Sequence, residues 1–262
     1  MPTPSLTQTH LDLLETCPRK FQHIFINGLS VPPDPELQDR ATWGNQFHLL
    51  MQQQALALPI AVMEPVDPKM MACITQLKQA APEFFNADLD PCRQSETQRT
   101  LSFNGYLLTV IYDLLILGPQ QAQIIDWKTY QRTPQRDRVE KNWQTRLYLY
   151  VLTETSGLEP EQVSMTYWFV RGRDPEAGQT VPESYRFSYS RSQHDRTRTE
   201  LTELTHRLTR LRALNDFPKV DISTGRCDSC TFARRCGRAE LGNERPTAAL
   251  SLDLATVEEI PL

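Results

Sequence analysis

No stretch of this sequence is apolar for long enough to cross a membrane, because its apolar runs fall short of the roughly 20 residues that a spanning helix needs. The first residues, MPTPSLTQTH, also lack the basic and apolar segments of a secretory signal. Excess positive charge is missing as well: the net charge is -4, so any nucleic-acid surface must be local. We therefore expect a cytoplasmic protein with no membrane partner, in a compartment where disulfides are rare.

What the sequence does contain is a pair of apolar segments that carry charged side chains. Leu107–Thr129 reads as two β-strands, because β-branched and aliphatic residues dominate and a Gly-Pro pair divides them. Asp113 lies in the first strand, and Asp126 and Lys128 share one face of the second, since they are two residues apart. Buried carboxylates are unfavourable unless they are paired or bind a metal. A hairpin that brings these three side chains together predicts a divalent-metal site.

Asp113 and the later DWKT sequence resemble the D…(D/E)-x-K core of the PD-(D/E)XK nuclease superfamily, and most of all its RecB-like branch. The resemblance implies that Asp113 and Asp126, with the backbone carbonyl of Trp127, hold Mg²⁺ or Mn²⁺. It also implies that Lys128 orients the attacking water or stabilises the transition state. One departure is that VIY precedes Asp113 where the family usually has a nearby glycine, which would make close approach of the DNA backbone less easy.

Two upstream residues extend this resemblance. His48 lies in a helix expected over about residues 42–57, where a lone histidine on an apolar face is most often a core residue. Gly44-x-x-x-His48 nevertheless resembles the family's G-x-x-x-H motif, which implies that His48 helps to hold the metal; the acid often found four residues later is here Gln52. Glu96 lies in the strand that begins near residue 93. The family often has a glutamate there that binds metal or orders the site, and the alternative is a solvent-facing strand residue.

A helix is expected over about residues 139–155, directly after the D-x-K strand. Gln144 and Tyr148 are four residues apart and so share one helix face. This Q-x-x-x-Y pattern resembles the motif with which RecB-like nucleases contact DNA. The basic segment over residues 130–138 is expected to be a loop that either touches phosphate or is simply solvated. The next strand, over residues 162–171, predicts a right-handed parallel crossover.

The six cysteines need an explanation other than disulfides. A C-x-x-C pair alone could mean zinc, redox chemistry or an iron–sulfur site. Cys227, Cys230 and Cys236 cannot complete a zinc site or a four-iron cluster, so a fourth ligand must come from elsewhere. Cys17 is the obvious donor, although by itself it would be interpreted as a small buried residue. We assign no ligand role to the other two, Cys73 and Cys92.

A distant N-terminal cysteine with C-x2-C-x5-C near the C-terminus resembles the iron–sulfur staple of CRISPR-associated RecB-like exonucleases and of the AddB-type helicase–nuclease subunit. The resemblance implies a [4Fe-4S] cluster bound by Cys17, Cys227, Cys230 and Cys236. Such a cluster would be structural, because phosphodiester hydrolysis transfers no electrons. A four-cysteine Zn²⁺ site at the same residues and unligated thiols stay open as alternatives.

These features predict an α/β fold: a restriction-endonuclease-like core, in which helices flank a mixed central sheet, with an N-terminal helical segment and a C-terminal cysteine cluster. Ser5 is expected to cap the first helix, and the proline-rich residues 30–38 are expected to form a loop. The expected division of the chain is a helical region over 1–92, the nuclease core over 93–189, a helix and the cysteine cluster over 190–241, and a tail over 242–262.

The resemblance therefore implies a metal-dependent DNA nuclease whose catalytic residues are Glu96, Asp113, Asp126, Lys128, Gln144 and Tyr148. By analogy with the family, we expect a single-strand exonuclease that acts on DNA ends in repair, recombination or CRISPR adaptation. Helicases or CRISPR adaptation proteins are the expected partners, since the chain has no helicase motif. One alternative is a non-catalytic iron–sulfur module that binds DNA or assembles a complex. Another is a zinc protein whose D-x-K pattern is accidental.

Overall fold

The computed structural model describes residues 3–32, 35–58, 67–85, 93–130, 133–171 and 181–238. The strands of its sheet are β1 (Ser5–Leu6), β2 (Arg93–Phe103), β3 (Tyr106–Leu117), β4 (Ala122–Lys128), β5 (Val163–Phe169) and β6 (Glu183–Ser188). The α-helices are α1 (Gln8–Thr16), α2 (Pro18–Phe21), α3 (Pro35–Ala55), α4 (Pro68–Ala80), α5 (Arg136–Lys141), α6 (Trp143–Ser156) and α7 (Arg191–Leu214).

β3 is the strand around which the sheet is built. β2 pairs antiparallel with it along nearly its whole length and so occupies one edge of β3. β1 pairs parallel at residues 107–108 and β4 pairs antiparallel at residues 114–117, so these two strands share the other edge. Within the described chain, the stretch of β3 between them has no strand beside it on that edge. Asp113 lies in this stretch.

The second half of the sheet extends from β4. β5 pairs parallel with β4, and α6 makes the connection between the two strands. β6 pairs antiparallel with β5 and ends the strand order β1-β3-β4-β5-β6. These pairings confirm the predicted parallel crossover and the mixed character of the sheet.

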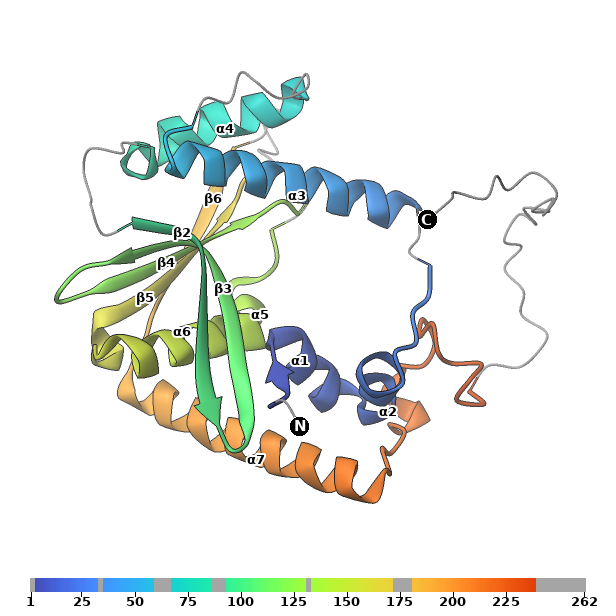
Figure 1. Cartoon of the computed structure of the whole chain (residues 1–262). Coiled ribbons are helices and arrows are strands. Elements are labelled where there is room, and N and C mark those ends of the chain that lie inside the picture. The colour runs from blue at the N-terminus through green and yellow to red at the C-terminus, as the bar shows by residue number, and fades with distance from the viewer. Residues whose placement is uncertain are drawn as a thin grey trace, which may run out of the picture.

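Helices cover both faces of the sheet (Figure 1). α3 and α4 cover one face, and their apolar residues pack with Leu114, Ile125 and Trp127 of the sheet. α6 and α7 cover the other, where Leu147 and Leu201 pack with the opposite faces of β3, β4 and β5. The predicted α/β class, a mixed central sheet flanked by helices, is confirmed.

Three local expectations were wrong. Ser5 does not cap the first helix: it pairs with Leu107 in β1, and Thr7 is the N-cap of α1. α3 begins at Pro35, inside the proline-rich stretch that was expected to be a loop. The basic loop after β4 is shorter than expected, because α5 begins at Arg136.

The apolar core crosses the boundaries of the predicted segments. One buried cluster includes Leu11 of α1, Ile124 of β4 and Leu208 of α7. The four-part division of the chain stays a prediction. The tail over 242–262 and Cys92 lie outside the described residues. None of the helices in the described ranges is long and apolar enough to cross a membrane.

The docking of α7 can be tested with two leucines of the same helix. Leu201 is 0% exposed, whereas Leu214 at the helix end is 75% exposed. Leu201→Ala should lower the free energy of unfolding by about 2–5 kcal/mol, because it removes buried methyl groups and leaves a cavity. Leu214→Ala should change it by less than about 0.5 kcal/mol. Urea denaturation measures both, and equal effects would contradict this packing.

Candidate active site

Asp113 lies at the point in β3 where side chains stop alternating between the two faces of the sheet. Residues two apart on a regular strand face the same side, yet Tyr112 is buried in the cluster with α6 and Leu114 in the cluster with α3. Asp113 and Leu114 thus both face the α3 side, although the pairing of β3 with β2 keeps the same register on both sides of Asp113. Opposite Asp113 on β2, Glu96 has a left-handed backbone (φ 48°) and is left out of the ladder that its neighbours continue. Such backbone strain concentrates at functional sites.

The carboxylate of Asp113 holds this break together. The ladder between β3 and β4 ends at Leu114, one position before Asp113 and Asp126 would have faced each other. Instead, the backbone N–H of Trp127 donates a hydrogen bond to Asp113 Oδ2 at 2.8 Å. His48 Nδ1 lies 3.3 Å from the same oxygen. One side chain on β3 therefore connects the backbone of β4 to helix α3.

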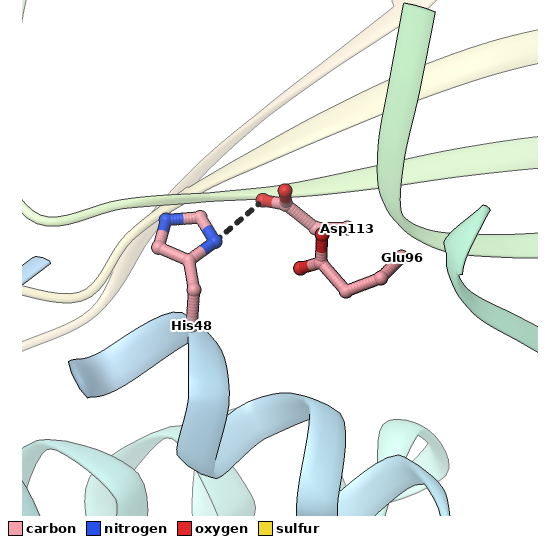
Figure 2. Close-up of side chains that lie close together, drawn as sticks. All are labelled: His48, Glu96 and Asp113. Atoms are coloured by element: carbon pink, nitrogen blue, oxygen red, sulfur yellow. Dashed lines mark ion pairs between the residues drawn. The ribbon is translucent and has the colours of Figure 1, made fainter. Parts of the chain in front are cut away.

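His48, Glu96 and Asp113 form a group that could hold a metal ion. One ligand atom from each residue lies within 4.8 Å of the others. Figure 2 shows His48 projecting from α3 towards Asp113, with Glu96 beside the same carboxylate. Burial alone would lower the pKa of His48, but the hydrogen bond to Asp113 and the negative charges around it raise that pKa overall. Burial, and then the charge of Asp113, raise the pKa of Glu96.

Asp126 lies outside this group of three and belongs to a second one, on the α6 side of β4. Its Oδ1 is 2.6 Å from Lys128 Nζ, and its Oδ2 accepts a hydrogen bond from Gln144 Nε2 at 2.6 Å. Lys128 Nζ donates in turn to Gln144 Oε1 at 2.9 Å. The acid, the lysine and the amide form a closed ring, and Asp126 and Lys128 share a face as predicted.

Burial controls the charges of this ring. It raises the pKa of Asp126, an effect that Lys128 opposes and the negative charge of Asp113 reinforces. Burial would lower the pKa of Lys128, but the charge of Asp126 reverses the effect and raises it, so the ammonium group stays charged. Both carboxylate oxygens of Asp126 therefore have a close partner, Oδ1 in Lys128 and Oδ2 in Gln144.

Gly44 sets how closely α3 approaches the end of β4. A Cβ atom at this position would lie 3.1 Å from Thr129 Oγ1. Such a contact is tight, so a side chain here would tend to push α3, and with it His48, away from the sheet. The G-x-x-x-H pattern thus has a steric meaning: the glycine permits the approach, and the histidine one turn later points at Asp113.

Tyr148 occupies a different environment from the one expected. It is 4% exposed, and its ring packs edge-to-face on Tyr112 with the centroids 5.4 Å apart. Burial, and then the charge of Asp126, raise the pKa of Tyr148 to about 12. Little of its surface is available for contact with DNA. Gln144 was also expected to contact DNA, and the structure places it between Asp126 and Lys128.

The four cysteines predicted as ligands line one cavity of about 80 Å³. None of them forms a disulfide. Burial raises the pKa of Cys236; Lys219 opposes this effect, and the negative charges of Cys17 and Cys230 reinforce it. The fold therefore brings Cys17 to the C-terminal cysteines despite their separation in the sequence (Figure 1).

His23 is a neighbour of this cavity that the sequence did not reveal. Its Nε2 lies 3.6 Å from Cys236 Sγ, and its ring is 5.2 Å from that of Phe232. It belongs to a single π-helical turn, Gln22–Ile26, a type of turn that is frequent at functional sites. No local pattern marks His23, because its partner is 213 residues away in the chain.

A family model and one solved structure of similar fold relate this chain to known proteins. The family model described as the PD-(D/E)XK nuclease superfamily matches residues 5–237. A candidate exonuclease from Eubacterium rectale has a similar structure, with a TM-score of 0.56 and 10% identity over 96% of this chain and 94% of its own. The structure of SSO0001 has 14% identity over 92% of this chain and 89% of its own, but a TM-score of only 0.40. No curated protein matches the chain.

The contact between His48 and Asp113 predicts a pH dependence in the metal-free protein. Because the folded-state pKa of His48 is raised, its protonated form contributes stability that is fully present below about pH 6.5 and is lost as the pH rises through the folded value. NMR titration should place the midpoint of His48 above 6.5, and Asp113→Asn should lower it.

Asp113→Asn should leave the titration midpoint of His194 unchanged, because the partner of His194 is Glu154. The difference in unfolding free energy between wild type and His48→Asn should fall as the pH rises above about 6.5. A His48 midpoint at or below that pH would show that the contact is absent in solution.

Proposed function

The chain belongs to the PD-(D/E)XK nuclease superfamily, and from this premise we propose that it is a metal-dependent DNA nuclease with its active site at the break between β3 and β4. The central mixed sheet with flanking helices is the restriction-endonuclease-like core that the family implies. The observation that carries the proposal is the placement of Asp113, Asp126 and Lys128 around the end of one ladder. Three charged groups at a single break in a sheet would be unfavourable without a function.

The donor set at the break fits a divalent cation. Asp113 offers carboxylate oxygen beside the nitrogen of His48, and Glu96 offers a third ligand atom within reach of both. Asp126, which lies on the neighbouring strand β4 and is paired with Lys128, would be a further carboxylate ligand by analogy with the family. Oxygen-rich sites of this kind suit Mg²⁺ and Mn²⁺. The carbonyl of Trp127 would be a further ligand, by analogy with the family.

A bound divalent ion would lower the pKa of a water molecule and neutralise charge that develops on the scissile phosphate. The residues of this chain do the rest. Lys128, held by Asp126 and Gln144, keeps its ammonium group charged and fixed for the attacking water or for the phosphate in the transition state. Gln144 and the buried Tyr148 act as positioning residues for Asp126 and Lys128 rather than as direct DNA contacts.

For the four cysteines we propose a structural [4Fe-4S] cluster rather than a zinc ion. All four thiols line one cavity, which supplies the required number of donors. By analogy with the cysteine staple of the family's iron–sulfur members, each cysteine would bind a different iron atom of the cluster.

The proposed reaction is exonucleolytic cleavage of single-stranded DNA ends. The Eubacterium rectale protein of similar fold is described as a candidate exonuclease, which agrees with this reaction. As expected from the sequence, roles in DNA repair, recombination or CRISPR adaptation would need a helicase or adaptation proteins as partners. The rival function, a non-catalytic DNA-binding or assembly module, accounts poorly for the ring of Asp126, Lys128 and Gln144.

Lys128→Ala tests the proposed reaction. In the presence of Mn²⁺, we expect the wild type to cleave end-labelled single-stranded DNA and the variant to lose at least about 100-fold in rate, because a preorganised charge at the transition state is removed. EDTA should abolish cleavage by both. Lys69→Ala, a change at an exposed lysine on α4, is the matched control and should retain full activity.

Thermal unfolding of Lys128→Ala must accompany the assay, because the variant leaves the buried Asp126 without its ion-pair partner. A folded variant that still cleaves at the wild-type rate would refute the assigned site. A wild type that binds DNA but never cleaves it would favour the assembly module.

Cys230→Ala tests the cluster. Protein purified without oxygen should contain about four iron atoms and four sulfides per chain, and should show broad visible absorbance. Cys230→Ala and Cys17→Ala should each lose most of the iron and absorbance. Cys73→Ala should not, because Cys73 packs between α4 and the sheet. Stoichiometric zinc in place of iron would establish the zinc alternative.

A further inference from the structure

A second cavity, of about 570 Å³, opens beside Lys128 on the side away from α3. Lys128, Tyr167 and Phe169 form its wall on the sheet, and Tyr130 and Arg138 border it from the segment that follows β4. The cavity is within the range of about 300–1,000 Å³ typical of sites for small ligands. Apart from Lys128, the residues assigned to the active site above do not line this cavity.

Both aromatic and cationic side chains line this cavity. Tyr130 is 51% exposed, so a face of its ring is open to a ligand. Its ring lies 6.5 Å from that of Phe169 and 6.0 Å from Lys128 Nζ. Lys128 Nζ is also 5.3 Å from the ring of Tyr167. An open ring beside fixed positive charge is the arrangement on which an unpaired nucleobase stacks.

The charge of the cavity suits a nucleic-acid backbone. Arg138 is exposed at its border and has no charge partner in the described chain, whereas its neighbour Arg136 lies over the ring of Phe187. Asp12 is the acid among the lining residues. Burial, and then the charge of Glu15, raise the pKa of Asp12, which weakens its opposition to a phosphate.

We propose that this cavity, which we call the Tyr130 pocket, binds one unpaired nucleotide next to the scissile phosphate: its base stacks on Tyr130 and its phosphate contacts Arg138. The inference rests on the proposed nuclease function and deepens it by assigning Tyr130 and Arg138 to the nucleotide that adjoins the scissile phosphate. Lys128 lines both the active site and the pocket, so a nucleotide in the pocket lies beside the reacting group.

A paired base could not use this pocket without leaving its duplex. A base inside a duplex is stacked on both faces and paired at its edge, and extruding it carries a free-energy cost. Single strands and frayed ends avoid that cost. The Tyr130 pocket thus gives a physical reason for the preference for single-stranded ends that the sequence suggested only by family analogy.

The test uses the full-length protein and short oligothymidylates that carry one 2-aminopurine at successive positions. In EDTA, where no cleavage occurs, we expect stacking to quench the fluorescence at one position near the end. Tyr130→Ala should abolish the quench and weaken binding about 5- to 150-fold, as for the loss of one stacked base. Tyr130→Phe should keep both the quench and the affinity. Val181→Ala, a change at another exposed apolar residue, should alter neither the quench nor the affinity.

Arg138→Ala gives a second measurement that does not depend on stacking. It should reduce the slope of log affinity against log salt by about 0.7, the contribution of one phosphate contact on a single strand. Arg210→Ala, on the exposed face of α7, should leave the slope unchanged. A steady-state assay in Mn²⁺ should show that Tyr130→Ala raises KM more than it lowers kcat.

The inference and the proposed function fail in different ways. Cleavage that depends on Mn²⁺ and Lys128, together with fluorescence and salt slopes that the Tyr130 and Arg138 variants leave unchanged, would overturn the pocket and leave the nuclease intact. Absence of both cleavage and DNA binding in the intact protein would overturn the proposed function and the pocket with it.

Discussion

The hydrogen bond from the backbone N–H of Trp127 to Asp113 is the interaction on which the site depends. A buried N–H needs a partner, and in a regular hairpin the facing strand would supply a carbonyl. Here the ladder stops at Leu114, and a carboxylate takes the place of the carbonyl. Because a side chain makes the link, the strands can separate without losing it. His48 contacts this carboxylate from α3, and Asp126 of β4 contacts Gln144 of α6.

The second constraint is the negative charge of the carboxylates, which is balanced differently on the two sides of the break. On the α6 side, Asp126 is balanced by Lys128 and oriented by Gln144, so that pair is nearly neutral. On the α3 side, Glu96 and Asp113 face a single histidine. The break as a whole carries more acid than base, and a divalent cation would restore the balance. The strained backbone of Glu96 fits this account, since strain is tolerated where a function holds it in place.

Much of this organisation could be predicted from the sequence. The features that could not be predicted escaped for physical reasons. Strand periodicity and the Gly-Pro break were sufficient to predict that β3 and β4 form a hairpin, which places Asp113 on one strand and Asp126 on the other. The break at Asp113 was not predictable, because nothing in VIYDLL marks the residue at which side chains stop alternating between the two faces of the sheet. The sequence grouped Gln144 with DNA contacts, since a pattern shows which face a residue shares but not which partner it meets. His23 escaped notice because only the tertiary fold brings it to Cys236.

The central claim is that the break between β3 and β4 is a single metal site to which both strands contribute. The most direct measurement is a crystal structure of the protein with Mn²⁺, with the ion located by its anomalous scattering. The account predicts a peak about 2 Å from carboxylate oxygens of both Asp113 and Asp126, with His48 alongside. A peak bound on the α3 side alone, with Asp126 still held by Lys128 and Gln144, would contradict the claim, as would an ion bound elsewhere in the molecule.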